Sequence, residues 1–290
     1  MCTILTAAGQ PLVGRTMDFP PRTPWRPTYL PVNYRWRPAN GDADITNHHA
    51  IIGGMRVADG HYLIGDGVND QGLFCAELFF PVAADYGGRQ TDGQLLTPQD
   101  FIMWVLGKHA TVAAVIADLS RITVNDDPWF DGQYYPFHWL LVDSTGAYTI
   151  EPLAGRLVVS KNKVGVLTNT PAYPLQLNKL NAYIGYDNLP FDQRIARVTT
   201  KITGTNSLQR FQRAAIARWQ ERPTTSDQLF TILDRLAVPK NPQHAHNYTH
   251  YEAVVDYSKK QYQFYDCRTT EVTVCCLPEL MQTLDAPTRF

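Results

Sequence analysis

The feature that most constrains the fold of this chain is the order in which strand-like and helix-like segments follow one another. Short runs of β-branched and aromatic residues form three groups, and two pairs of helical segments separate the groups. Tight turns inside each group favour antiparallel pairing, and helices that follow whole groups of strands are typical of α+β proteins. The sequence therefore predicts antiparallel sheets with helices packed on their outer faces.

The expected strands cover residues 3–8, 11–17, 49–54, 61–65 and 72–80 in the first group, 139–142, 148–151, 157–159 and 164–167 in the second, and 251–256, 262–267 and 272–277 in the third. The strands of the first group are expected to extend the opening hairpin into one sheet. No linker, repeat or low-complexity segment interrupts the 290 residues, which predicts one domain over residues 1–290.

Four helices are expected from their capping residues and apolar spacing. Thr97 is a candidate N-cap with Pro98 at the first helical position, and that helix should reach residue 106. Thr111 should open a second helix that runs to residue 119. The other two are expected over residues 208–220 and 226–236, where apolar residues recur on one face.

The opening hairpin places a cysteine at the start of its first strand. If the turn centres on Gly9 and Gln10, paired residues have numbers that sum to 19. Cys2, Ile4, Arg15 and Met17 then share one face, and Arg15 lies diagonally across from Cys2. Residues 19–48 lack periodicity and predict an ordered surface loop.

Three aromatic residues of that loop, Trp25, Tyr29 and Tyr34, are candidates for a pocket wall. The alternative is that they anchor the loop to the core. Phe19 is followed by Pro20 and Pro21, and paired prolines stiffen the chain where it leaves the hairpin.

Composition excludes several classes of partner. A formal net charge of -1 gives no basic face for nucleic acid or an anionic membrane. Five cysteines without CxxC spacing argue against a disulfide framework and a zinc knuckle. The start of the chain has no apolar leader, and no apolar run is long enough to span a bilayer, so a soluble cytoplasmic protein without a lipid-modified cysteine is expected.

Cys2 could carry chemistry through its position alone. Methionine aminopeptidases remove an initiator methionine that precedes a small residue, and removal of Met1 would leave Cys2 with a free α-amino group. This amine has a pKa of about 7.7–8.0 and can accept the proton of a thiol whose pKa is about 8.5. One residue then supplies both nucleophile and base, with Arg15 and Asp18 as plausible helpers. The alternative is a buried thiol that only fills space.

Several motifs resemble one enzyme family in sequence and in order. They are MCT and GRTMDF at the start, DGVNDQGL at residues 66–73 with FFP at 79–81, FHWLLVDSTG at 137–146, VGVLTNTP at 164–171 and QRFQR at 209–213. Together they resemble the choloylglycine hydrolase family of N-terminal nucleophile (Ntn) hydrolases, which includes penicillin V acylases and bile salt hydrolases. The resemblance implies a four-layer αββα sandwich of two antiparallel sheets flanked by helices and cleavage of a linear amide without a cofactor.

The resemblance also implies roles for individual residues. Cys2 would be the nucleophile, Arg15 and Asp18 would tune and hold it, Asn169 would donate to the oxyanion, and Arg210 would be an active-site cation. Without the resemblance, Asn169 would be interpreted as a turn residue and Arg210 as a solvated arginine on a helix face.

The chain departs from the family pattern at Phe79. Bile salt hydrolases typically have asparagine there and penicillin V acylases often have tyrosine, so a second oxyanion donor would have to be a backbone N–H. An aromatic residue at position 79 slightly favours a substrate with an aryl-acyl group such as phenoxyacetyl. The resemblance further implies a homo-oligomer, a tetramer or dimer, although the stretch between Asn169 and Arg210 is shorter than in the usual bile salt hydrolases.

Two function classes follow. The first is an amidase for a small N-acyl substrate, of penicillin V acylase type, with bile salts, other N-acyl amides or acyl homoserine lactones as alternatives. The second is a catalytically silent binding relative. His244, His246 and His250 have no acidic partner at useful spacing, so no metal site is expected. Strand core positions are expected for Cys75, His138, Trp139 and at least one of Cys275 and Cys276.

Overall fold

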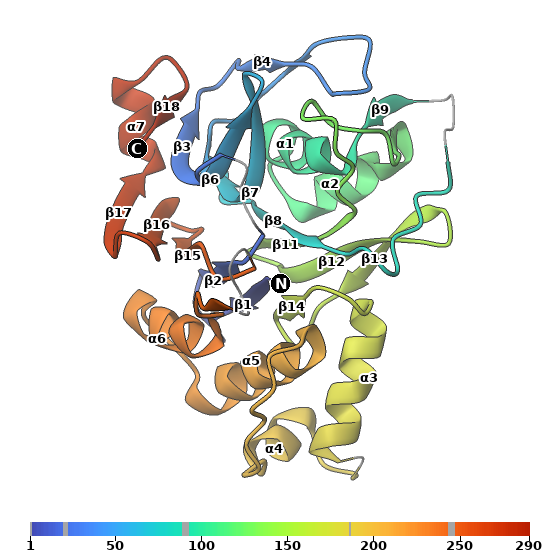
Figure 1. Ribbon diagram of the computed structural model, residues 1–290, viewed down its shortest axis with the longest axis vertical. Helices are drawn as coiled ribbons and strands as arrows, with labels where there is room; N and C mark the ends of the chain where they lie inside the picture. The colour runs from blue at the N-terminus through green and yellow to red at the C-terminus, as the bar shows by residue number, and fades with distance from the viewer. Residues whose placement is uncertain (1, 20–22, 89–92, 186, 243–246) are drawn as a thin grey trace.

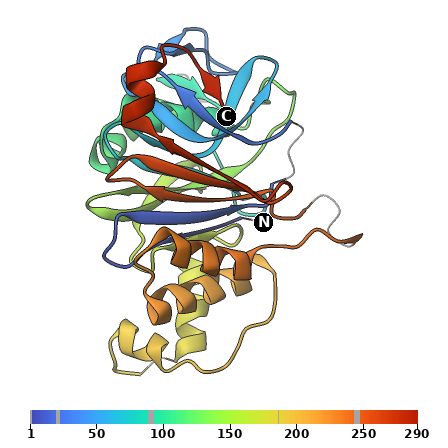
Figure 2. The same cartoon turned by 90° about the vertical axis from the view of Figure 1, so that its left-hand side faces the viewer.

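The computed structural model describes residues 2–19, 23–88, 93–185, 187–242 and 247–290 (Figure 1). Two antiparallel sheets lie face to face, and helices cover the outer face of each sheet (Figures 1 and 2). This succession of helices, sheet, sheet and helices is the αββα sandwich that the family resemblance implies. The expected fold class is confirmed.

Each sheet draws strands from distant parts of the chain. The six-stranded sheet has the order β14 (Val166–Thr168), β1 (Thr3–Thr6), β2 (Leu12–Met17), β15 (Tyr251–Asp256), β16 (Gln261–Asp266) and β17 (Glu271–Cys276). The eight-stranded sheet has the order β13 (Arg156–Lys161), β12 (Gly146–Leu153), β11 (Phe137–Asp143), β8 (Phe74–Phe79), β7 (His61–Asn69), β6 (Ile51–Ala58), β3 (Arg26–Leu30) and β18 (Thr288–Arg289). Two small ribbons pair β4 (Arg35–Trp36) with β5 (Ile45–Thr46) and β9 (Gln94–Leu96) with β10 (Ile122–Val124).

Each helix layer belongs to one sheet. Helices α1 (Pro98–Lys108) and α2 (Val112–Asp118) pack on the eight-stranded sheet, and a short 3-10 turn follows at Leu119–Arg121. Helices α5 (Ser207–Glu221) and α6 (Ser226–Leu236) pack on the six-stranded sheet. Helices α3 (Tyr173–Ile184) and α4 (Phe191–Ala196) lie beside α5. Helix α7 (Leu277–Thr283) follows β17. The four expected helices are therefore present as α1, α2, α5 and α6.

The capping residues explain where the expected helices begin. The Thr97 hydroxyl donates to the Asp100 carboxylate at 2.8 Å, and Pro98 opens α1. The Thr225 hydroxyl accepts the backbone N–H of Gln228 at 3.3 Å at the start of α6. Helices α3, α4 and α7 were not expected, and two of them, α3 and α7, carry a proline in their first turn.

Two expectations about the first third of the chain are wrong. Residues 19–48 are not a loop throughout, because β3, β4 and β5 lie within them. Strand β3 begins with Arg26 and Pro27, so its sequence does not show a typical strand pattern. The segment nevertheless gains its backbone hydrogen bonds by pairing with β6.

The strands of residues 51–79 also do not extend the opening hairpin. They belong to the eight-stranded sheet, because the free edge of β2 pairs with β15 from near the C-terminus. Proximity in sequence therefore pointed to the wrong partner, and long-range pairing determined the sheet.

Close packing of α6 on the hairpin depends on a glycine. A Cβ atom at Gly14 of β2 would lie 3.2 Å from the Cδ1 atom of Leu233, so the absent side chain makes room for the helix. Leu233 is fully buried, whereas Leu175 on α3 is 47% exposed.

This difference gives a stability prediction. We expect Leu233→Ala to lower the free energy of unfolding by about 2–5 kcal/mol, because it leaves a cavity under the strand that carries Arg15. Leu175→Ala, the matched control, should cost less than about 1 kcal/mol. Urea unfolding followed by circular dichroism measures both, and equal losses would contradict the described packing.

Candidate active site

The opening hairpin has the expected register. Thr3 pairs with Thr16 and Ile4 with Arg15, so paired numbers sum to 19. Cys2 immediately precedes β1 and is 2% exposed. Its sulfur lies 3.8 Å from Nη2 of Arg15 and 3.9 Å from the sulfur of Met17. The prediction that these side chains share one face is confirmed.

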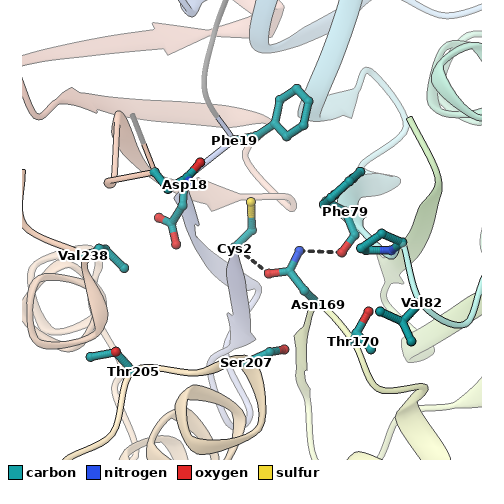
Figure 3. Close-up of a pocket in the computed structure, with 12 residues that line it drawn as sticks. Cys2, Asp18, Phe19, Phe79, Val82, Asn169, Thr170, Thr205, Ser207 and Val238 are labelled. Atoms are coloured by element: carbon teal, nitrogen blue, oxygen red, sulfur yellow. Dashed lines mark hydrogen bonds between the residues drawn. The ribbon is translucent and has the colours of Figure 1, made fainter. Parts of the chain in front are cut away.

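Asn169 meets Cys2 because β14 pairs with β1. Thr168 lies opposite Thr3, which places Asn169 beside the start of the chain. The Asn169 Oδ1 atom accepts the Cys2 main-chain N–H at 2.5 Å, and its Nδ2 atom donates to the Phe79 carbonyl at 2.7 Å (Figure 3). The side-chain amide thus joins Cys2 to the end of β8, in the opposite sheet.

Gln176 fixes the segment that carries Asn169. From α3, its Nε2 atom donates to the main-chain carbonyl groups of Asn169 at 2.7 Å and Pro171 at 2.6 Å. Sequence reasoning missed this residue. The signal that could have found it was its position, seven residues after Asn169 on a helix that starts just beyond the turn.

Asp18 and Arg210 form a buried ion pair below the site. Nη1 of Arg210 contacts Oδ2 of Asp18, while Nη2 of Arg210 donates to the Thr16 hydroxyl at 2.9 Å. The Thr249 hydroxyl donates to Oδ1 of Asp18 at 2.6 Å. Both members of the pair are fully buried, and Asp18, unlike Arg210, lines the cavity in front of Cys2. The structure therefore places Arg210 behind Asp18 and not against the cavity.

The ion pair sets the charge of Asp18. Burial alone raises the pKa of the Asp18 carboxyl, but the Arg210 guanidinium and the Thr249 hydroxyl outweigh burial and bring that pKa below its usual range. Asp18 is therefore a carboxylate at neutral pH, held in place by Arg210 and Thr249.

A cavity of about 550 Å³ opens in front of the cysteine. Its lining is mostly apolar and includes Phe19, Phe79, Val82 and Val238, together with Cys2 and Asn169 (Figure 3). A mostly apolar hollow with a few polar groups at one end is typical of small-molecule sites.

Trp25, Tyr29 and Tyr34 do not line the cavity, and the alternative, that such aromatic residues anchor their segment to the core, is confirmed for Trp25 and Tyr29. Trp25 and Tyr29 are buried in the core, and Tyr34 packs its ring against Tyr62 with centroids 6.0 Å apart. Phe19 lines the cavity instead, because the chain leaves the hairpin directly beside Asp18. Its ring lies 5.8 Å from that of Phe79.

The other candidates occupy structural positions. His138 is buried between Glu151 and the Thr168 carbonyl, and Trp139, Cys75 and Cys275 are in the core as expected. His244 and His246 lie outside the described residues, and His250 packs against Tyr248. Among the residues that the structure describes, no group of three or more metal-ligating side chains gathers, and no helix is long and apolar enough to cross a bilayer.

Comparison with known proteins identifies the family. The profile of the linear amide C-N hydrolases, choloylglycine hydrolase family, matches residues 2–287. The chain belongs to the choloylglycine hydrolase family. A bile salt hydrolase/transferase of Clostridium perfringens is 31% identical over 198 residues, which cover 66% of this chain and 60% of that protein. The chain thus matches less than two thirds of this relative's length.

Solved structures of the family share the fold. A mutant of the conjugated bile acid hydrolase from Clostridium perfringens superposes with a TM-score of 0.85 at 22% identity, covering 100% of this chain and 96% of that chain. The penicillin V acylase from Agrobacterium tumefaciens superposes with a TM-score of 0.77 at 19% identity, covering 100% and 90%. Both likenesses concern the sandwich and its topology.

The buried ion pair gives a pH-dependent prediction. Arg210→Met removes the partner of Asp18 and should lower the free energy of unfolding at pH 7 by about 3–5 kcal/mol. Because the folded pKa of Asp18 is depressed, the pair stabilises the wild type above about pH 4 and is lost as the pH falls through that pKa. The difference between variant and wild type should therefore shrink on acidification.

Arg213→Met is the control, since the side chain of Arg213 donates to the main-chain carbonyls of Gly204, before α5, and Arg235, in α6. Its effect should be below about 1 kcal/mol and independent of pH. Denaturant titrations between pH 7 and about pH 2 measure both variants. A cost for Arg210→Met that stays constant down to the lowest pH would contradict the assignment.

Proposed function

We propose that this protein hydrolyses a linear amide with Cys2 as its nucleophile, after Met1 has been removed. The observation that carries the proposal is the environment of Cys2: its sulfur lies beside Arg15 at the wall of the cavity, and its nitrogen is held by Asn169. In the processed chain that nitrogen is an α-amine, and the same hydrogen bond to Asn169 orients it beside the thiol.

The proposed reaction has two halves. The neutral α-amine takes the thiol proton, and the thiolate attacks the amide carbonyl to form a tetrahedral intermediate. The C–N bond breaks, the amine product leaves with the proton, and a thioester remains on Cys2. Water, deprotonated by the same α-amine, then attacks the thioester and releases the acid and the free thiol. Each step uses groups of this chain and water, so the proposal needs no cofactor.

Asn169 and Arg15 provide the electrostatic part of the proposal. Nδ2 of Asn169 carries two hydrogens, of which the Phe79 carbonyl accepts one, so the second can donate to the oxyanion. The Arg15 guanidinium attracts the negative thiolate and repels a protonated amine, so its charge favours the reactive form of both groups. Asp18, which Arg210 holds, lines the same cavity and can bind the amine side of the substrate.

The acyl group is proposed to be aromatic, as in penicillin V. Phe19 and Phe79 line the cavity, and Tyr135 lies 5.0 Å from Phe19 in an edge-to-face arrangement. Such rings favour a flat phenoxy group. Conjugated bile salts are the second candidate, which the activity named for the curated relatives supports. Other N-acyl amides and acyl homoserine lactones offer a bond of the same kind.

We propose that residues 1–290 form one catalytic domain whose mature chain starts at Cys2, and that the protein is cytoplasmic and assembles as a dimer or tetramer. The competing class is a silent binding relative that keeps the fold without turnover.

Substitution of the nucleophile tests the proposal. Cys2→Ala should abolish amide cleavage and leave the melting temperature nearly unchanged, because the sulfur is required for chemistry. Cys2→Ser should retain the geometry but lose most of the rate, since an alcohol is much harder to deprotonate. Release of the amine product is measured by chromatography. Comparable turnover by Cys2→Ala would refute the mechanism, and a wild type that cleaves no amide would support the silent relative.

A substrate comparison separates the two acyl groups. We expect penicillin V to be cleaved with a higher kcat/KM than glycocholate, because a steroid requires a longer and wider slot than a phenoxy ring. Phe79→Ala should lower kcat/KM for penicillin V by about tenfold through lost ring contact. Cleavage of glycocholate alone would overturn the penicillin V assignment and leave the amidase mechanism intact.

A further inference from the structure

A carboxylate of the opposite sheet lies on the far side of Arg15. Asp66, on β7, is fully buried, and Arg15 is 1% exposed. Nη1 of Arg15 lies 3.3 Å from Oδ1 of Asp66 and donates to the main-chain carbonyl of Gly65. Nη2 of Arg15 donates to the Glu77 carbonyl at 2.8 Å and faces the Cys2 sulfur. One guanidinium therefore bridges a carboxylate and the proposed nucleophile.

Two tyrosines complete the surroundings of Asp66. The Tyr251 hydroxyl donates to Oδ1 of Asp66, and the Tyr262 hydroxyl donates to Oδ2 at 3.0 Å. Both come from the six-stranded sheet, so the cluster spans the space between the sheets. Gly54 leaves room for the hydroxyls, since a Cβ there would lie 2.5 Å from the Tyr251 oxygen and 2.7 Å from the Tyr262 oxygen.

Only some of the groups around the sulfur carry charge. Burial raises the pKa of Glu77 and of both tyrosines well above their usual values, which keeps the tyrosines neutral at pH 7 and favours the neutral form of Glu77. Asp18 and Arg210 compensate one another in their ion pair. Burial raises the pKa of Asp66 above its usual value, and Arg15 and the two hydroxyls reduce that rise. The contact between the Asp66 carboxyl and the Arg15 guanidinium, at 3.3 Å, stabilises the carboxylate form.

We propose that Asp66 is a positioning residue that acts on Cys2 through Arg15: its carboxylate offsets part of the positive charge that the Arg15 guanidinium places beside the Cys2 sulfur. Two main-chain carbonyls, of Gly65 and Glu77, hold the guanidinium in addition to Asp66. Removal of the carboxylate charge should therefore leave Arg15 near the sulfur with less of its charge compensated. The role in catalysis rests on the proposed function, but the effect on the thiol does not.

The test is the pH dependence of Cys2 alkylation by iodoacetamide, followed by mass spectrometry of the peptide that contains Cys2. Asp66→Asn should lower the pKa of the thiol by about one pH unit, because a negative charge near the sulfur is lost. Tyr262→Phe keeps the carboxylate and removes a hydroxyl dipole that offsets it, so the thiol pKa should rise by a few tenths. Opposite directions are the expected signature.

A purely structural role for Asp66 predicts a different outcome. Loosening of Arg15 would raise the thiol pKa in both variants, and that result, or no change in Asp66→Asn, would overturn the proposal. If Asp66→Asn does not fold, Tyr262→Phe still tests the proposal, because an unchanged or lowered thiol pKa in that variant overturns it. Asp100→Asn is the matched control, because Asp100 is also buried but bonds to Thr97 and Trp129 at α1, and it should leave the thiol pKa unchanged.

Alkylation requires no substrate, so this experiment is independent of amide turnover. A lowered thiol pKa in Asp66→Asn without any amide cleavage by the wild type would support the electrostatic role of Asp66 and reject the proposed function. Amide cleavage by the wild type together with an unchanged thiol pKa in Asp66→Asn would support the proposed function and reject the role of Asp66.

Discussion

A buried guanidinium between two sheets is the constraint on which the rest of the site depends. Arg15 is almost completely excluded from solvent, and a buried charge is tolerated only where partners replace water. Its partners come from both sheets: Asp66 and two main-chain carbonyls from the eight-stranded sheet, and the Cys2 sulfur from its own sheet. The distance between the sheets and the position of the thiol are thereby linked.

Strand pairing places the remaining groups around Cys2. Antiparallel pairing of β1 with β14 brings Asn169 to the main-chain nitrogen of Cys2, although 167 residues separate the two. Asp18 directly follows the end of β2, and Arg210 of α5 contacts Asp18 on the side away from the cavity. Because strands and helices hold each group, the site is built on rigid elements, as a preorganised catalytic centre requires.

The sequence predicts the local part of this arrangement better than the distant part. The register of the opening hairpin follows from its turn, and the ends of α6 follow from the apolar residues that recur on one of its faces. Asn169 and Arg210 emerged only through the family resemblance, because their neighbours in sequence do not show what they contact. Asp66, Tyr262 and Gln176 were missed because their contacts form only when segments far apart in the chain meet. The placement of 51–79 in the wrong sheet has the same cause.

The central claim is that the thiol and the α-amine of one residue act together beside Arg15. Trapping of the acyl-enzyme tests it most directly: the protein is mixed with penicillin V, quenched in acid within milliseconds to seconds, digested and analysed by mass spectrometry. The account predicts an N-terminal peptide that begins at Cys2 and carries one phenoxyacetyl group on sulfur. Turnover by a chain that retains Met1, or an acyl group on a different residue, would contradict it.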